Sequence, residues 1–157
     1  MMELVAGLGE YIVSDREDDI LRTFALASCV AVTVYNPVKR VAGMIHLVLP
    51  TPLNNNDREE RPGYFAETGI PLLISTMCTK YSCRKEDLHV QIYGGADSRF
   101  HNNIYNVGRR NIEVVKYMLH VLGLKIHKAD LHGYESRTLV MDVKTGLVRV
   151  SRQPIIY

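Results

Sequence analysis

The sequence predicts one α/β domain, covering residues 1–157, with more strand than helix. The length of 157 residues fits an ordinary single domain. The composition, 46% hydrophobic and 23% charged, is typical of a globular protein and excludes wholesale disorder or a collagen-like repeat. Segments rich in valine and isoleucine outnumber those with helical spacing, which favours strands as the main element.

The amino-terminal part of the chain is predicted to be mainly extended. Residues 10–14 form a short strand, and 21–49 are rich in Val, Ile and Ala with a single break at 36–39. Because little polar sequence interrupts either flank, we expect a β-hairpin with strands at about 29–35 and 40–49, closed by the four-residue loop 36–39.

The middle of the chain alternates between loops and regular elements. Three prolines, three asparagines and a run of charges predict that 50–64 is a loop. Apolar residues at helical spacing predict a helix at about 66–82, although Pro71 leaves its start uncertain. Residues 88–93 alternate like a strand, and 97–106 are a polar loop.

The carboxy-terminal part begins with the clearest helix in the chain, at about 107–122. Asn106 fits the N-cap and Gly123 the position after the helix. The helix carries an apolar stripe of Ile112, Val115, Leu119 and Leu122. Strands are expected at 125–129, 137–143 and 147–152, the last two joined by a tight hairpin.

The overall charge and hydropathy exclude several functional classes. A formal net charge of +2 argues against a dedicated nucleic-acid binder. No apolar run approaches the roughly 18 residues that a membrane-spanning helix needs, so we expect no direct membrane insertion. No basic residue precedes Arg16, which is unlike a secretory signal. We therefore expect a soluble cytoplasmic protein.

The cysteines and histidines do not form a metal-binding pattern. The three cysteines, Cys29, Cys78 and Cys83, include no C-x-x-C pair, and the six histidines are scattered. An odd number of cysteines without an export signal also argues against a disulfide framework. We expect no metal and no cofactor, and we interpret Cys78 and Cys83 as structural.

The predicted hairpin places a cysteine opposite a histidine. If the chain folds back at 36–39, Cys29 faces His46, and a register shift of two would still leave both side chains on one face. A histidine can accept the thiol proton, and the thiolate can attack an amide carbonyl to give a thioester. The alternative is that both are ordinary core residues, because most free cysteines are inert. Spacing alone leaves both interpretations open.

Short motifs along nearly the whole chain carry a family resemblance. They lie at 27–32, 35–37, 43–50, 94–96, 108–111, 130–133 and 145–146. In this combination and order the chain resembles the CheD family, the chemoreceptor glutamine deamidases. The resemblance implies an α/β domain with a β-sandwich-like, mostly antiparallel core flanked by helices, similar to the catalytic domains of deamidating toxins.

The resemblance also implies an activity. It implies a cytoplasmic enzyme, a protein-glutamine glutaminase, that hydrolyses particular glutamine side chains of chemoreceptors to glutamate and releases ammonia. Cys29 is then the nucleophile and His46 the base. The family's third residue is a threonine upstream of the cysteine, which Thr23 matches, and we expect it to orient the imidazole. Methylated receptor glutamates are a second substrate open to the same thiolate.

The resemblance implies two partners. These are the cytoplasmic helices of chemoreceptors and a CheC-type chemotaxis phosphatase, whose activity family members can raise. An alternative function is therefore a regulatory binding partner of that phosphatase, with catalysis secondary.

Two positions depart from the usual family pattern. Ala27 replaces the glycine that usually precedes the Ser-Cys pair, which alters how closely the backbone approaches a substrate carbonyl. Ile45 replaces the asparagine that usually precedes the histidine, which removes a polar neighbour of the base.

Four further features have both a functional and a structural interpretation. The turn at 94–96 is expected to shape one wall of the site, and 50–64 to border the cleft and contact the receptor. Arg109 and Arg110, in the first turn of a helix, either bind an acidic surface or are simply solvated. The 97–106 loop, with two aromatic residues and a histidine, is a candidate partner contact.

Overall fold

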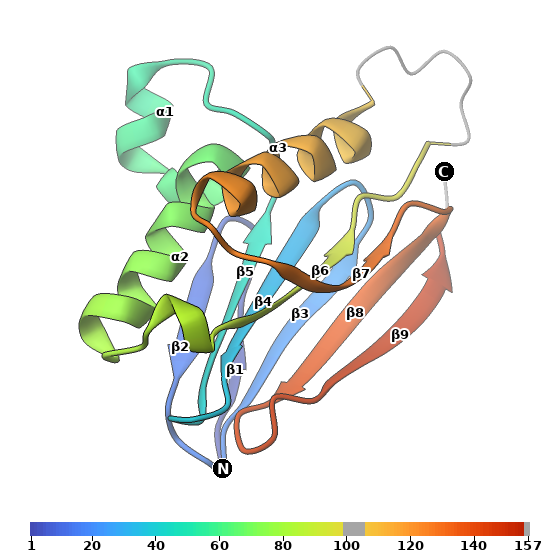
Figure 1. The fold of residues 1–157 in the computed structure, drawn as a ribbon. Coiled ribbons are helices and arrows are strands. Elements are labelled where there is room, and N and C mark those ends of the chain that lie inside the picture. The colour runs from blue at the N-terminus through green and yellow to red at the C-terminus, as the bar shows by residue number, and fades with distance from the viewer. Residues whose placement is uncertain (99–105, 156–157) are drawn as a thin grey trace.

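The computed structural model describes residues 1–98 and 106–155, and it is a mixed α/β structure (Figure 1). Its strands are β1 (Glu3–Val5), β2 (Tyr11–Ser14), β3 (Ile20–Leu26), β4 (Val30–Asn36), β5 (Val41–Leu47), β6 (His89–Gly94), β7 (Ile126–Leu131), β8 (Glu135–Asp142) and β9 (Val148–Pro154). Its helices are α1 (Asn55–Glu60), α2 (Ala66–Lys80) and α3 (Val107–Val121), with short 3-10 turns η1 (Pro62–Tyr64) and η2 (Lys85–Asp87).

The strands form two sheets that face each other. One sheet has the order β1-β3-β8-β9 and the other the order β2-β5-β4-β6-β7. Only β1 with β3 and β6 with β7 pair in parallel among the described strands. This arrangement confirms the predicted β-sandwich-like, mostly antiparallel core.

The core has two layers, one on each face of the five-stranded sheet. Alternate residues of β4 and β5 pack either against α2 and α3 or against the four-stranded sheet, which explains why both strands are buried along their whole length. Figure 1 shows both helices on one side of the five-stranded sheet. The sequence period of two thus supplies both core layers from the same strands.

The predicted hairpin exists, but its register differs from the prediction. Asn36 stays in β4, pairs with Val41, and accepts hydrogen bonds from the backbone N–H groups of Val38 and Lys39 through its Oδ1. The loop is therefore 37–40 rather than 36–39. Consequently His46 pairs directly with Ala31, and the expected direct opposition of Cys29 and His46 is wrong.

The extended segment 21–49 has a second break that the sequence analysis missed. Residues 20–26 form β3 in one sheet, and the chain then crosses at 27–29 to enter β4 in the other sheet. Ala25 adopts a left-handed backbone conformation with φ of 52°, and the pairing of β3 with β8 shifts register at this point. This irregularity redirects a chain that its apolar composition predicts to be continuous.

The segment 50–64 is not the loop that was predicted, because it contains α1 and η1. Asn54 caps α1 by accepting a hydrogen bond from Asp57 N–H, and Arg61 forms an i, i+4 ion pair with Asp57. None of the α1 residues is buried. Local capping and charge pairing therefore form this short helix without an apolar face.

The two longer helices confirm their predictions. The helix α2 runs through Pro71, and α3 ends before Gly123, whose φ of 73° suits glycine. Asn106 occupies the N-cap position of α3, but its side chain makes no capping hydrogen bond. The expected strands at 10–14, 88–93, 125–129, 137–143 and 147–152 all appear, with ends shifted by at most two residues.

The described residues contain neither a membrane-crossing helix nor a metal-binding cluster. Within 1–98 and 106–155, no helix is long and apolar enough to cross a membrane. The same residues contain no group of three or more His, Cys, Asp or Glu side chains that could hold a metal ion. Residues 99–105 lie outside the described part, so the loop and partner contact predicted there stay predictions.

Candidate active site

The segment that carries Cys29 connects the two sheets and is held by hydrogen bonds on three consecutive carbonyl groups. The carbonyl of Ala27 accepts from Ala96 N–H at 2.7 Å and that of Cys29 from Gly95 N–H at 2.8 Å. The carbonyl of Ser28 accepts from the side-chain amide of Asn111 at 2.9 Å. Residues 27–29, hereafter the nucleophile loop, are therefore fixed although they belong to neither sheet.

The turn at 94–96 fits closely against the nucleophile loop. Gly94 has a φ of 110°, and a Cβ atom there would overlap the carbonyl of Cys29. Gly108 in α3 meets the same turn from its other side, because a Cβ atom there would overlap the carbonyl of Ala96. Glycine at both positions lets three backbone segments pack in direct contact.

His46 is linked to the opposite sheet through Thr23. The Oγ1 atom of Thr23 lies 2.7 Å from Nδ1 of His46 and 2.7 Å from the carbonyl oxygen of Ala6. A carbonyl can only accept, so the single hydroxyl proton of Thr23 is donated to Ala6. Thr23 must then accept from His46, which places the ring proton on Nδ1.

This tautomer leaves Nε2 of His46 without a proton. The Nε2 atom is buried and has no hydrogen-bond partner among the residues that the structure describes. Buried polar atoms are nearly always paired, and exceptions are concentrated at functional sites. The ring therefore presents an unoccupied basic nitrogen.

Cys29, one residue before β4 begins, lies on the same side of the five-stranded sheet as His46. His46 pairs with Ala31, two residues beyond Cys29, and both Ala31 and Cys29 pack in the cluster between the sheets. Cys29 is thus offset by two residues from the position directly opposite His46. The same-face prediction is confirmed, because the register error is two residues and the side-chain period is also two.

Burial shifts the pKa values of both groups toward their neutral forms. Desolvation raises the pKa of the Cys29 thiol to about 11, although the residue's own backbone N–H opposes the shift. Desolvation also lowers the pKa of His46 to about 4. At neutral pH both shifts favour a thiol and a neutral imidazole over a thiolate–imidazolium ion pair.

A pocket of about 240 Å³ opens beside the nucleophile loop. Its lining includes Ala27 and Ser28 of that loop, Ala96 from the adjoining turn, and residues 106–109 at the start of α3. Ala96 of the 94–96 turn therefore lines this pocket, and the role of the turn as a wall of the active site stays a prediction. At the rim, Arg109 forms an ion pair of 3.1 Å with Asp97 and is 63% exposed, while Arg110 is also exposed.

The two departures from the family pattern occupy different environments. Ala27 lines the pocket and its carbonyl is held by the 94–96 turn. Ile45 is fully buried in the cluster between the five-stranded sheet and the helices, on the face opposite to His46. Its side chain therefore packs against α2 and does not adjoin the imidazole of His46.

The sequence analysis missed Asn111 as a residue of the site. Its side chain is completely buried, and its Nδ2 donates to the carbonyls of Ser28 and Val48 at 2.9 and 3.0 Å. The available signal was positional, since Asn111 precedes Val115 by four residues and so lies on the apolar stripe of α3. A polar residue on a buried stripe needs internal partners.

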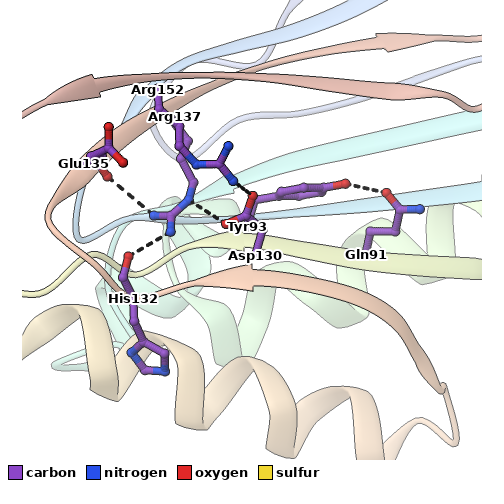
Figure 2. A network of polar contacts seen from close by, with 7 residues as sticks. All are labelled: Gln91, Tyr93, Asp130, His132, Glu135, Arg137 and Arg152. Atoms are coloured by element: carbon purple, nitrogen blue, oxygen red, sulfur yellow. Dashed lines mark hydrogen bonds and ion pairs between the residues drawn. The ribbon is translucent and has the colours of Figure 1, made fainter.

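A second polar cluster also joins the two sheets (Figure 2). Asp130 of β7 accepts from Arg137 Nε at 3.2 Å and forms an ion pair with Arg152. Arg137 also donates to the carbonyl of His132 at 2.8 Å, whereas the His132 ring points away from the cluster. Burial and the Asp130 carboxylate together raise the pKa of nearby Tyr93 to about 12.

The fold and these side chains supply the three groups that a cysteine-dependent hydrolase uses: a thiol, a basic imidazole nitrogen and a residue that orients the ring. A family model described as CheD chemotactic sensory transduction matches residues 48–152. The chain belongs to the CheD family.

Relatives of known description match almost the full chain, including the nucleophile loop. The chain is 44% identical over 154 residues to the probable chemoreceptor glutamine deamidase CheD of Syntrophotalea carbinolica, covering 96% of this chain and 94% of the relative. It is 34% identical over 151 residues to the chemoreceptor glutamine deamidase CheD of Thermotoga maritima, covering 96% and 92%.

Solved structures outside this group share the fold. The crystal structure of the hypothetical protein YfiH of Bacillus licheniformis aligns with a TM-score of 0.54 at 14% identity and covers 78% of this chain. YlmD of Geobacillus stearothermophilus aligns with a TM-score of 0.53 at 12% identity, again over 78% of this chain. The chain spans about half the length of each, 51% and 50%.

Proposed function

We propose that this chain, as a single domain, hydrolyses glutamine side-chain amides of chemoreceptors to glutamate and releases ammonia. The printed names of its relatives support the substrate class. The observation that carries the chemistry is the hydrogen-bonded chain from His46 through Thr23 to the carbonyl of Ala6, which leaves Nε2 unprotonated on the face that holds Cys29.

The first half of the reaction uses Cys29 as nucleophile and His46 as base. As the sulfur attacks the amide carbon, the thiol proton passes to Nε2, because burial favours the neutral form of each group in the resting site. The resulting imidazolium donates from Nδ1 to Thr23, which keeps the ring in place. The imidazolium then gives the proton from Nε2 to the leaving nitrogen, the C–N bond breaks, and ammonia departs from a thioester.

The second half hydrolyses the thioester. The neutral imidazole takes a proton from water, the oxygen attacks the carbonyl carbon, and the proton returns to sulfur as the C–S bond breaks. The pocket beside Ala27 and Ser28 provides room for the glutamine side chain next to the nucleophile loop. The products are a glutamate side chain and a regenerated thiol.

The direct test is to incubate the protein with a receptor cytoplasmic fragment and measure both ammonia and mass. Each converted amide raises the fragment mass by about 1 Da, and Cys29→Ala abolishes the gain because the thioester cannot form. Cys78→Ala is the matched control, since Cys78 lies in α2 and packs in the core on the helix side of the five-stranded sheet, and we expect wild-type conversion. Conversion by Cys29→Ala at the wild-type rate would show that the mechanism is wrong.

Two further proposals concern where in the cell the protein works and which proteins it binds. We propose that the protein works in the cytoplasm, on receptor helices, and binds a CheC-type phosphatase; the family membership supports these statements. Calorimetric titration of the phosphatase into Cys29→Ala separates catalysis from regulation. If the protein is mainly a regulatory partner, this variant still binds the phosphatase and activates it normally. Methanol release from methylated receptor tests hydrolysis of methyl esters by the same thiol.

A further inference from the structure

Asn111 connects the two chain segments that carry the proposed nucleophile and base. One hydrogen of its side-chain amide is donated to the carbonyl of Ser28, directly before Cys29. The other is donated to the carbonyl of Val48, two residues after His46. Both acceptors are carbonyl oxygens, so the amide nitrogen of Asn111 faces them and its oxygen points away.

These two contacts lie where the hairpin pairing ends. The β4–β5 pairing runs from Asn36 with Val41 to Val30 with Leu47, and no further pair continues it toward Cys29. In a continued register, Cys29 would face Val48. The amide of Asn111 takes the place of that missing backbone pairing, and it does so from a helix packed against the other face of the sheet.

Burying the amide of Asn111 costs free energy, and the need to fill space in the core does not explain why an amide stands there. Its side chain is completely buried, and its Oδ1 has no hydrogen-bond partner among the residues that the structure describes. Apolar residues of similar size stabilise such positions at least as well as half-paired polar groups do. An amide at this point in the apolar stripe therefore indicates a requirement for its two donors.

We propose that Asn111 is a positioning residue that sets the approach of the Cys29 sulfur to Nε2 of His46. This inference rests on the proposed function, because it concerns the geometry of that same site. Without Asn111, the nucleophile loop keeps its contacts to the 94–96 turn, but the side-chain link between the carbonyls of Ser28 and Val48 is lost. Small errors in the distance between reacting groups reduce rates strongly.

The test compares Asn111→Ala with Val115→Ala, one helical turn further along α3. Val115 is completely buried in the same core and has no polar side-chain atom that could bind Ser28 or Val48, so its truncation controls for lost stability. We expect Asn111→Ala to lower kcat for the receptor fragment about 10- to 100-fold with KM changed less than about threefold. Val115→Ala should keep both within about twofold. Equal kcat in the two variants would overturn the proposal.

A double-mutant cycle with His46→Ala distinguishes positioning from general structural support. The readout is the rate of Cys29 alkylation by iodoacetamide at pH 7, followed by peptide mass spectrometry so that Cys78 and Cys83 do not contribute. In the wild-type background we expect Asn111→Ala to slow alkylation about tenfold; in the His46→Ala background the same change has almost no further effect. Additive effects in the cycle would overturn the proposal.

Alkylation also separates this inference from the proposed function. It needs no receptor, so a protein that converts no glutamine still reports whether Asn111 aligns the sulfur with the imidazole. Asn111→Ser, which keeps one donor in a shorter side chain, serves if Asn111→Ala does not fold. We expect its alkylation rate to fall between those of the wild type and His46→Ala; a wild-type rate would count against positioning.

Discussion

Two polar clusters join the same pair of sheets, and they are built on opposite principles. Thr23 and His46 form a neutral connection, a single hydrogen bond backed by a carbonyl group. Asp130, Arg137 and Arg152 form a charged connection in which the Asp130 carboxylate meets both arginines (Figure 2). The neutral cluster leaves one basic nitrogen unpaired, whereas the guanidinium of Arg137 contacts both Asp130 and two backbone carbonyls.

The difference indicates that the charged cluster stabilises the fold, whereas the neutral cluster serves the reaction. A buried arginine whose N–H groups are hydrogen-bonded is fixed in position, but it has no free group that could bind a substrate or accept a proton from it. An imidazole fixed through one nitrogen keeps the other free to accept a proton. We therefore expect substitutions in the charged cluster to change mainly the free energy of unfolding, and those in the neutral cluster to change mainly the rate.

The largest effect is expected at Arg137, in the charged cluster. Its side chain is 5% exposed, so Arg137→Gln leaves the carbonyl of His132 and part of the Asp130 charge unpaired. We expect urea denaturation to show a loss of about 2–4 kcal/mol in the free energy of unfolding. The exposed pair of Arg40 with Glu17 is the control, because Arg40→Gln should cost less than about 1 kcal/mol.

The comparison fails if Arg137→Gln and Arg40→Gln destabilise the protein equally. It also fails if folded Arg137→Gln loses more than about tenfold in kcat at a temperature where both proteins are native. Either result would mean that the charged cluster takes part in the chemistry or is solvated as freely as a surface pair.

The next effect is expected at Thr23, in the neutral cluster. Thr23→Val keeps the shape but removes the hydroxyl, so Nδ1 loses its acceptor and the ring can adopt either tautomer. Groups that orient a reacting residue commonly contribute 10- to 100-fold, and we expect kcat to fall by about that much. Thr23→Ser keeps the hydroxyl and should remain within about threefold in steady-state assays. Similar rates for the valine and serine variants would remove Thr23 from the mechanism.

The sequence predicted correctly that Cys29 and His46 share one face of the hairpin, because the alternation of side chains along a strand does not depend on where the loop lies. The loop is at 37–40 rather than 36–39, yet Cys29 and His46 still share a face, since alternation survives any register error of two. Composition could not show the crossing at 27–29, because apolar residues continue on both sides of it and the change of sheet depends on a left-handed residue at Ala25.

Contacts between sheets are harder to predict than contacts within one. The pair of Thr23 with His46 joins residues on different sheets, and no periodicity along the chain relates their positions; only the family resemblance indicated Thr23. Asn111 and Arg137 had a weaker signal. Each is a polar residue at a position whose helical or strand period places it among buried apolar residues.

The smallest effect concerns the pH dependence of stability, and it tests how far His46 is kept neutral. Its folded pKa of about 4 lies below the value of about 6.5 expected in the unfolded chain. Between these values the unfolded state binds more protons, so stability falls as the pH is lowered from about 6.5 toward 4. Between pH 7 and pH 5, wild type should lose roughly 1–2 kcal/mol more than His46→Gln does.

Urea denaturation at the two pH values measures this difference, and His120→Gln provides the control. His120 lies exposed in the last turn of α3, so its removal should leave the acid-side loss of the wild type in place. Parallel losses in wild type and His46→Gln would mean that the imidazole is charged or freely solvated at pH 5. The contrast between a neutral catalytic cluster and a charged structural cluster would then no longer hold.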